Sequence, residues 1–344
     1  MSGVSDSTVG SNVSQVSSES SRSRRRGRKP LRSYLEAYAF VGLLVLAFLF
    51  FSLWSKTAAT FTSTANLQVL IGSNTVVAIV ALGALIPLVC NEWDLSIGAS
   101  ATLAGVYAAQ ALVHGTTVPL AILLAVAVGL LVGVVNALLV TRLGVNAVIT
   151  TLGTSIIITG VISLKTHGNT ITGNIPSSLT NFGTLNWFGI PRPAFALAAV
   201  AGLVYYGLNH TPWGRYLYAL GSNRSAARLV GIRTKLMIGT TFVVGGAICG
   251  AGGILQVAQS GSADPNLSNT LLLPALAAAF LSAASIRPGR YNVGGVLVAV
   301  YFLAVLNSGL NLAGAAEYVS DFVNGTALIA GVGLAVRLGR RTEP

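Results

Sequence analysis

Apolar runs, most of them long enough to cross a bilayer as a helix, follow one another along most of the chain. About 20 helical residues cross about 30 Å of hydrocarbon, and only 194–209 and 270–285 fall clearly short of that length. The pattern predicts an all-α integral membrane protein with about ten transmembrane helices. The helices are expected near residues 35–54, 69–90, 95–113, 118–141, 145–165, 194–209, 236–258, 270–285, 292–313 and 317–338.

Composition excludes a soluble domain as the alternative. Hydrophobic residues make up 53% of the 344 residues and charged residues only 9%, whereas a soluble domain carries about 25% charged residues. The chain also holds 39 glycines, which allow membrane helices to pack closely. Most residues are therefore expected to face lipid or other helices.

The first part of the chain differs from the rest. Residues 1–33 are rich in Ser and Arg and nearly free of large apolar residues, so they are expected to form a disordered tail. Its composition suits either a nucleic-acid-binding arm or a cytoplasmic arm that touches anionic lipid, and the lipid-facing arm is favoured. Residues 34–340 are predicted to form one transmembrane domain.

Basic residues set the orientation. With ten crossings and a cytoplasmic N-terminus, 18 of the 21 basic residues lie on the inner side, and only Lys56, Lys165 and Arg192 lie outside. Cytoplasmic loops of membrane proteins carry an excess of Lys and Arg. Both termini and the stretch 210–235 are therefore predicted to be cytoplasmic, and 166–193 is expected to be an external polar loop.

The chemistry that the sequence lacks is informative. None of the four lysines follows a glycine, so no phosphate-binding P-loop is present, and the three histidines lie at no metal-ligand spacing. The chain is therefore not expected to be an enzyme or to bind a metal or cofactor.

Glu92 and Asp94 are two of the few acids beside apolar runs. Helix capping and a functional role, such as in ion-coupled transport, both remain open for them.

The stretch 210–235 is the most patterned polar part of the chain. Asn223 is expected to cap a short helix from Arg224 to Val230, which Gly231 ends. Ala226, Ala227 and Val230 are expected to share one side of this helix. Such a helix suits docking to a partner protein or lying on the bilayer surface, and the residues alone do not decide between them.

Several stretches between about 66 and 338 resemble one known family, the permease subunits of ribose-type ABC sugar importers. The matching stretches are Trp93-Asp-Leu-Ser-Ile-Gly98, Asn146-Ala-Val-Ile-Thr-Thr-Leu-Gly153, the segment Gly214 to Ile232, Ser262-Ala-Asp-Pro265 and Leu306-Asn-Ser-Gly-Leu310. Two stretches depart from the family pattern: Asn91-Glu92 replaces a Gly-Gly pair, and 279–290 lacks a Gly-rich segment.

The resemblance implies a bacterial inner-membrane importer that works as a pair of permeases. Its expected partners are ABC ATPase subunits, which hydrolyse the ATP, and an extracytoplasmic solute-binding protein; nucleic acid is not expected. The expected cargo is a monosaccharide, with nucleosides as an alternative within the family. An ion-coupled secondary transporter and a membrane scaffold are the rivals from other classes.

Two groups of site residues follow from this resemblance and from the polar positions in the helices. The segment that couples to the ATPase is implied to include Gly214, Arg215, Gly221, Asn223, Ala226, Ala227, Arg228 and Gly231. A sugar path needs hydrogen-bonding groups, and the candidates are Asn74, Asp94, Ser96, Asn136, Thr150, Thr151 and Asn307. Polar contacts between helices would explain such residues equally well.

Overall fold

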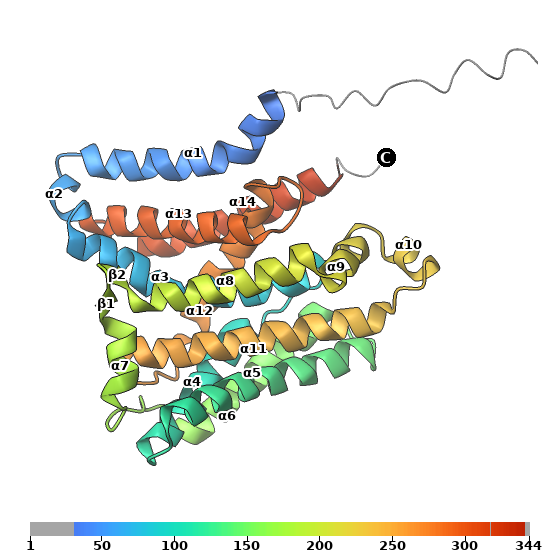
Figure 1. Cartoon of the computed structure of the whole chain (residues 1–344), viewed down its shortest axis with the longest axis horizontal. Helices are drawn as coiled ribbons and strands as arrows, with labels where there is room; N and C mark the ends of the chain where they lie inside the picture. The colour runs from blue at the N-terminus through green and yellow to red at the C-terminus, as the bar shows by residue number, and fades with distance from the viewer. Residues whose placement is uncertain (1–30, 317, 341–344) are drawn as a thin grey trace, which may run out of the picture. The chain divides into compact units, whose positions relative to one another are not determined.

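A computed structural model describes residues 31–316 and 318–340, and most of them are helical (Figure 1). Within the described residues, each apolar run named above is helical except for about two residues or fewer at its ends, so the all-α prediction is confirmed. Residues 31–33 of the predicted tail begin the first helix, and the rest of that tail lies outside the described residues. The elements are α1 (Leu31–Leu53), α2 (Ala58–Phe61), α3 (Thr64–Val89), α4 (Ile97–Val113), α5 (Val118–Thr141), α6 (Ala147–Thr166), α7 (Ser177–Thr184), β1 (Asn186–Trp187), β2 (Ile190–Pro191), α8 (Arg192–His210), α9 (Pro212–Ser222), α10 (Arg224–Leu229), α11 (Thr234–Ser260), α12 (Leu267–Leu281), the 3-10 turn η1 (Ser282–Ala284), α13 (Val293–Leu312) and α14 (Tyr318–Arg340).

Length and hydropathy set the number of helices that can cross a bilayer. Among residues 31–316 and 318–340, six helical segments are long and apolar enough: Thr64–Val89, Val118–Thr141, Ala147–Thr166, Thr234–Ser260, Leu267–Ala284 and Val293–Leu312. The apolar helical stretches Tyr38–Leu53 and Ile97–Val113 are shorter. The structure thus supports a multi-span membrane protein, and the count of ten crossings stays a prediction.

Glycine contacts hold α11 at the centre of the bundle, against α5, α4 and α3. A Cβ on Gly129 of α5 would lie 2.2 Å from the carbonyl oxygen of Gly246 in α11, and a Cβ on Gly246 would lie 2.3 Å from that of Gly129. Without side chains at these positions, the two backbones approach to direct contact, as small residues permit in membrane helices.

The predicted external loop 166–193 contains regular structure that the sequence analysis missed. Helix α7 places Leu179 in the core and packs on α11, and β1 and β2 form a two-residue antiparallel hairpin. A single hydrophobic turn, with Leu179 and Phe182 three residues apart, was the signal available for α7, and it is too short to stand out. The long-loop prediction is therefore corrected.

The connections between helices meet in two groups at opposite ends of α8 (Figure 1). At the end that carries α9 and α10, Asn209 accepts a hydrogen bond from Arg287 (2.6 Å) and Tyr218 donates to the Tyr291 carbonyl (2.8 Å). At the hairpin end, Gln68 donates to the Gly189 carbonyl (3.3 Å) and Ile171 pairs with Ala263. We call these two groups the α9–α10 end and the hairpin end.

Candidate functional site

The segment between α8 and α11 folds into two short helices. The Thr211 hydroxyl accepts a hydrogen bond from the Gly214 amide (3.3 Å) and so caps α9, and Pro212 occupies the first turn of that helix. The Asn223 side chain accepts from the Ala226 amide (2.9 Å) and caps α10. The predicted cap and short helix are confirmed. α9 was missed, although a Thr followed by Pro is a helix-start signal.

The face that α10 presents to its surroundings differs from the expected one. Ala227 is only 3% exposed and packs into the core of this same chain, so it cannot meet a partner surface directly. Leu229 and Val230 are 89% and 77% exposed instead. The expectation that Ala226, Ala227 and Val230 share one side is therefore wrong. The reason is that α10 rests on the bundle through Ala227.

Exposed basic residues lie near this apolar pair in the sequence. Arg215, Arg224, Arg228 and Arg233 are exposed, and Gly231 has a φ of +85°, which ends α10 and turns the chain toward α11. A residue with a Cβ is strained in that backbone conformation, so glycine suits the position. The result is an apolar tip, Leu229 and Val230, which is flanked along the chain by Arg224, Arg228 and Arg233; we call these three arginines the basic rim.

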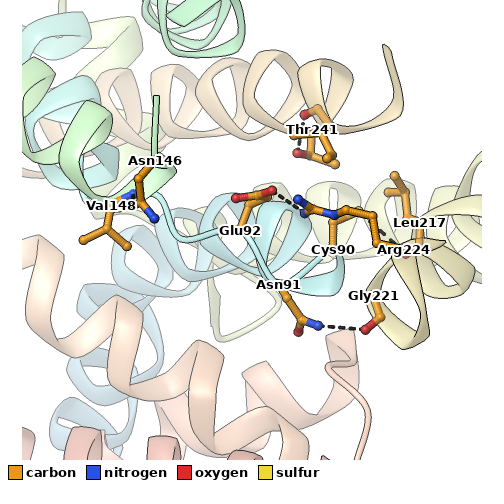
Figure 2. Close-up of polar contacts among 10 residues, drawn as sticks. Cys90, Asn91, Glu92, Asn146, Val148, Leu217, Gly221, Arg224 and Thr241 are labelled. Atoms are coloured by element: carbon orange, nitrogen blue, oxygen red, sulfur yellow. Dashed lines mark hydrogen bonds and ion pairs between the residues drawn. The ribbon is translucent and has the colours of Figure 1, made fainter. Parts of the chain in front are cut away.

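The connection from α3 to α4 holds α9 and α10 in place (Figure 2). The Asn91 side chain donates to the Gly221 carbonyl (2.7 Å), and Glu92 forms an ion pair with Arg224. The Cys90 thiol faces the Leu217 carbonyl at 3.6 Å. We call these three contacts the clamp. Asn91 and Glu92 are the residues that replace the Gly-Gly pair of the resembled family.

The Cys90 thiol serves a packing role in the clamp. Burial, together with the nearby negative charge of Glu92, raises the pKa of this thiol to about 12, although Arg224 acts in the opposite direction. The thiol therefore stays protonated and unreactive near neutral pH. Cys249 is buried as well. Neither native cysteine should interfere when single cysteines are introduced for labelling.

Gly221 meets α3 through its backbone. A Cβ at this position would lie 2.0 Å from the Val89 carbonyl oxygen, which is closer than side-chain atoms come. We expect Gly221→Ala to push α9 away from α3 and to break the adjacent bond between Asn91 and Gly221. Transport should fall several-fold while the amount of protein in the membrane stays within twofold of wild type. Wild-type transport by Gly221→Ala would show that this close contact is dispensable.

A buried polar cluster lies directly beyond the clamp. Asp94 accepts hydrogen bonds from the amide and hydroxyl of Ser96 (2.8 and 2.6 Å). Ser96 in turn accepts from the Asn136 side chain of α5 (2.8 Å), and all three residues are almost completely buried. Asp94 thus forms a turn before α4 and does not occupy the capping position itself, which Ser96 holds. The cluster joins α4 to α5.

Helix α6 meets the same connection through Thr151. Its hydroxyl accepts a hydrogen bond from the Leu95 amide (3.0 Å) and donates to the Ala147 carbonyl (2.9 Å). The neighbouring Thr150 is buried. Neither its hydroxyl nor the side-chain Oδ1 of Asn136 has a hydrogen-bond partner in the part of the chain that the structure describes. Unpartnered polar atoms in a core are costly and are usually explained by a ligand, water or a second conformation.

The structure separates the remaining predicted path residues from this cluster. Asn74 donates to the Leu70 carbonyl of its own helix (2.9 Å), and Asn307 faces Asn324 of α14 at 3.5 Å. Of the seven predicted path residues, Asp94, Ser96 and Asn136 share a hydrogen-bonded cluster. Thr151 joins it by accepting a hydrogen bond from the backbone amide of Leu95, between Asp94 and Ser96. The ion pair between Glu92 and Arg224 was missed, because 132 residues separate its partners.

These features define a helical membrane protein with an exposed apolar tip at one end and a buried polar cluster behind it, an arrangement consistent with a transport permease. Residues 66–332 match the family described as branched-chain amino acid transport system, permease component, and the chain belongs to it. The chain is 30% identical to the ribose import permease protein RbsC of Escherichia coli K12, over 87% of this chain and 92% of that protein.

Other curated proteins match over similar lengths. The autoinducer 2 import system permease protein LsrC of Photorhabdus laumondii is 30% identical, over 88% of this chain and 89% of that protein. The D-allose transport system permease protein AlsC of E. coli K12 is 27% identical, over 94% of this chain and 97% of that protein. No solved structure matches the chain.

Proposed function

We propose that the chain is the transmembrane permease subunit of an ATP-driven importer in the bacterial cytoplasmic membrane, and that it forms the path for a monosaccharide. The observation that carries this proposal is full-length similarity to permeases named for ribose and D-allose import. The working assembly contains two permease subunits, two ATPase subunits inside the cell and a solute-binding protein outside. The match to an autoinducer 2 permease keeps other small polar solutes as alternatives.

Contacts between connections support the ten-crossing topology with both termini inside. In that topology, residues 90–92, 209–224 and 287–291 all lie on the cytoplasmic side, and they contact one another at the α9–α10 end. Residues 68, 171, 189 and 263 all lie outside, and they contact one another at the hairpin end. A different number of crossings in the middle of the chain would place contacting residues on opposite faces.

Cysteine labelling tests this topology. Ser222 and Thr172 are both exposed, one at each end of the bundle. In intact cells, an impermeant thiol reagent should label Thr172→Cys and leave Ser222→Cys unlabelled, and permeabilised cells should show labelling of both. Labelling of position 222 but not 172 in intact cells would reverse the proposed orientation.

The apolar tip of α10 is the proposed docking point for the ATPase. Leu229 and Val230 offer exposed apolar area, and the basic rim suits a partner surface with acidic residues. Because the clamp ties α10 to the α3–α4 connection, a push on the tip is passed to the segment that carries Asp94 and Ser96. The lipid-surface alternative for this helix predicts no such partner.

The buried polar cluster is the proposed part of the path. Ser96, Asn136, Thr150 and Thr151 are neutral hydrogen-bonding groups, which suit a hydroxylated solute better than an ion. The unpartnered atoms of Asn136 and Thr150 are free to bind such a solute when the helices separate. Polar contact between helices without any solute is the competing role.

Reconstitution tests the function as a whole. Proteoliposomes are prepared with this chain, its ATPase and its binding protein. They should accumulate radiolabelled ribose or a related monosaccharide only when ATP is present on the side of the membrane that carries the ATPase. The isolated chain should bind no nucleotide, since it has no P-loop. Accumulation driven by a proton or sodium gradient, without the ATPase, would instead establish ion-coupled secondary transport.

A further inference from the structure

The hairpin end carries an exposed aromatic group that the transport mechanism does not use. Phe188, at the tip of the β1–β2 hairpin, is 100% exposed. Trp187 is exposed beside it, and its ring packs against Phe195 of α8, with ring centroids 5.6 Å apart. The Arg192 guanidinium lies over the Trp187 ring at 5.1 Å. The group therefore joins aromatic rings to a stacked cation.

The hairpin holds Phe188 in an unfavourable backbone conformation. The two residues of its loop, Phe188 and Gly189, have φ values of +52° and +81°, as a type I′ turn requires. Glycine or asparagine suits the first of these positions, whereas a bulky side chain is strained there. A fully exposed phenylalanine gains nothing from the protein to offset that strain. Contact with something outside the chain would offset it.

The hairpin is fixed to the bundle both at Pro191 and at the backbone of its loop, while the Phe188 side chain stays fully exposed. The Gln68 side chain of α3 donates to the Gly189 carbonyl (3.3 Å), and Pro191 is buried against Gly72. The paired strands match Trp187 with Ile190. The aromatic tip is thus presented by a short, anchored element.

Helix α8 sets the depth of the hairpin. It has 19 residues and spans about 28 Å, close to the thickness of the hydrocarbon layer of about 30 Å. Its exposed side is apolar at Leu203 and carries Tyr205 and Tyr206 near the far end, where Tyr206 stacks on His210. Aromatic residues gather at both membrane interfaces of spanning helices. Helix α8 is not among the six segments that are apolar enough by hydropathy, but the proposed topology has it cross the membrane. In that topology the hairpin, which directly precedes α8, lies at the level of the lipid headgroups.

We propose that the β1–β2 hairpin is a lipid-interface anchor, in which Trp187 and Phe188 insert among the headgroups. Arg192 supports the Trp187 ring from within the protein and donates to the Asn181 carbonyl (3.3 Å). The occupant is the bilayer itself because the aromatic group continues the exposed apolar side of α8. This inference rests on α8 crossing the membrane as in the proposed topology. A solute-binding protein docked on the tip is the outcome that would replace it.

Fluorescence quenching tests the anchor. The full chain, with Phe188→Cys or Ile190→Cys labelled by an NBD dye, is placed in vesicles with and without headgroup-nitroxide phosphatidylcholine. Ile190 belongs to the same exposed hairpin and lies outside the strained turn. Ile190→Cys therefore still reports on the hairpin if Phe188→Cys does not fold. Thr172→Cys, in the polar part of the same connection, is the matched control.

Both hairpin positions should be quenched at least twofold by the nitroxide lipid and only weakly by aqueous iodide, and Thr172→Cys should show the opposite order. Strong iodide quenching of the hairpin positions would place the tip in water and overturn the anchor. Protection from both quenchers would indicate a covering protein and overturn it too. Nitroxide lipid occupies both leaflets and the assay needs no uptake, so neither a reversed orientation nor a wrong solute affects the result.

Discussion

Substituting Leu229 by Asp is expected to abolish ATP-driven uptake while the permease still inserts into the membrane. Leu229 is exposed at the tip of α10, so the change leaves the packing of this chain intact. At a docked ATPase surface, however, it would replace apolar contact with a buried, poorly paired carboxylate, which costs about 2–5 kcal/mol. Uptake should fall at least tenfold, and less ATPase should co-purify with the permease.

Two control variants separate docking from folding. Leu229→Met keeps an apolar side chain and should retain most uptake. Ser225→Asp adds the same charge to the first turn of α10, where the helix dipole favours an acid, and should have a much smaller effect. If Leu229→Asp matched wild type in both uptake and ATPase content, α10 would lie on the bilayer surface and the docking proposal would be wrong. Ala227→Asp is a poor test, because Ala227 is buried within the permease.

Reversing one charge of the clamp is expected to uncouple the proposed docking tip from the proposed path. The side chain of Glu92 is 12% exposed and that of Arg224 is 42% exposed, so this ion pair is only partly screened by water. Glu92→Arg would place two cations together beside the α3–α4 connection. We expect uptake to fall several-fold, while the ATPase remains bound because Leu229 and Val230 are unchanged.

The double exchange, Glu92→Arg with Arg224→Glu, should recover most of the lost uptake. Glu92→Gln keeps a hydrogen-bond acceptor and should lose less than Glu92→Arg does. Recovery in the double variant is the decisive measurement, since only a direct interaction between the two residues produces it. Equal losses in the single and double variants would show that the pair contributes nothing to coupling.

The sequence was sufficient for features that depend on local pattern. The apolar runs placed the long helices, and the order Asn223 to Gly231 placed the start and end of α10, because capping and glycine termination act within a few residues. The order of the polar positions also pointed to Asp94, Ser96, Asn136 and Thr151. These residues lie on different elements, and only the fold shows that they meet.

Features that depend on distant contacts could not be predicted. Ala227 looks like a surface residue in sequence, and it is buried because Ile232 and the rest of the loop fold back against the bundle. The Glu92 to Arg224 pair joins two loops that are adjacent only after α3 and α9 have packed. The β1–β2 hairpin was hidden because the first of its two loop positions with positive φ holds phenylalanine, where a turn signal would be Asn, Asp or Gly.

The direct backbone contact between α5 and α11 limits how the permease can change shape. Where Gly129 faces Gly246, no side chain can change rotamer to let one helix slide past the other. We therefore expect α5 and α11 to move together as a rigid pair during a transport cycle. Opening and closing would then take place where side chains form the contact. The boundary between Asn307 and Asn324 on α13 and α14 is of that kind, since two flexible amides meet there at 3.5 Å.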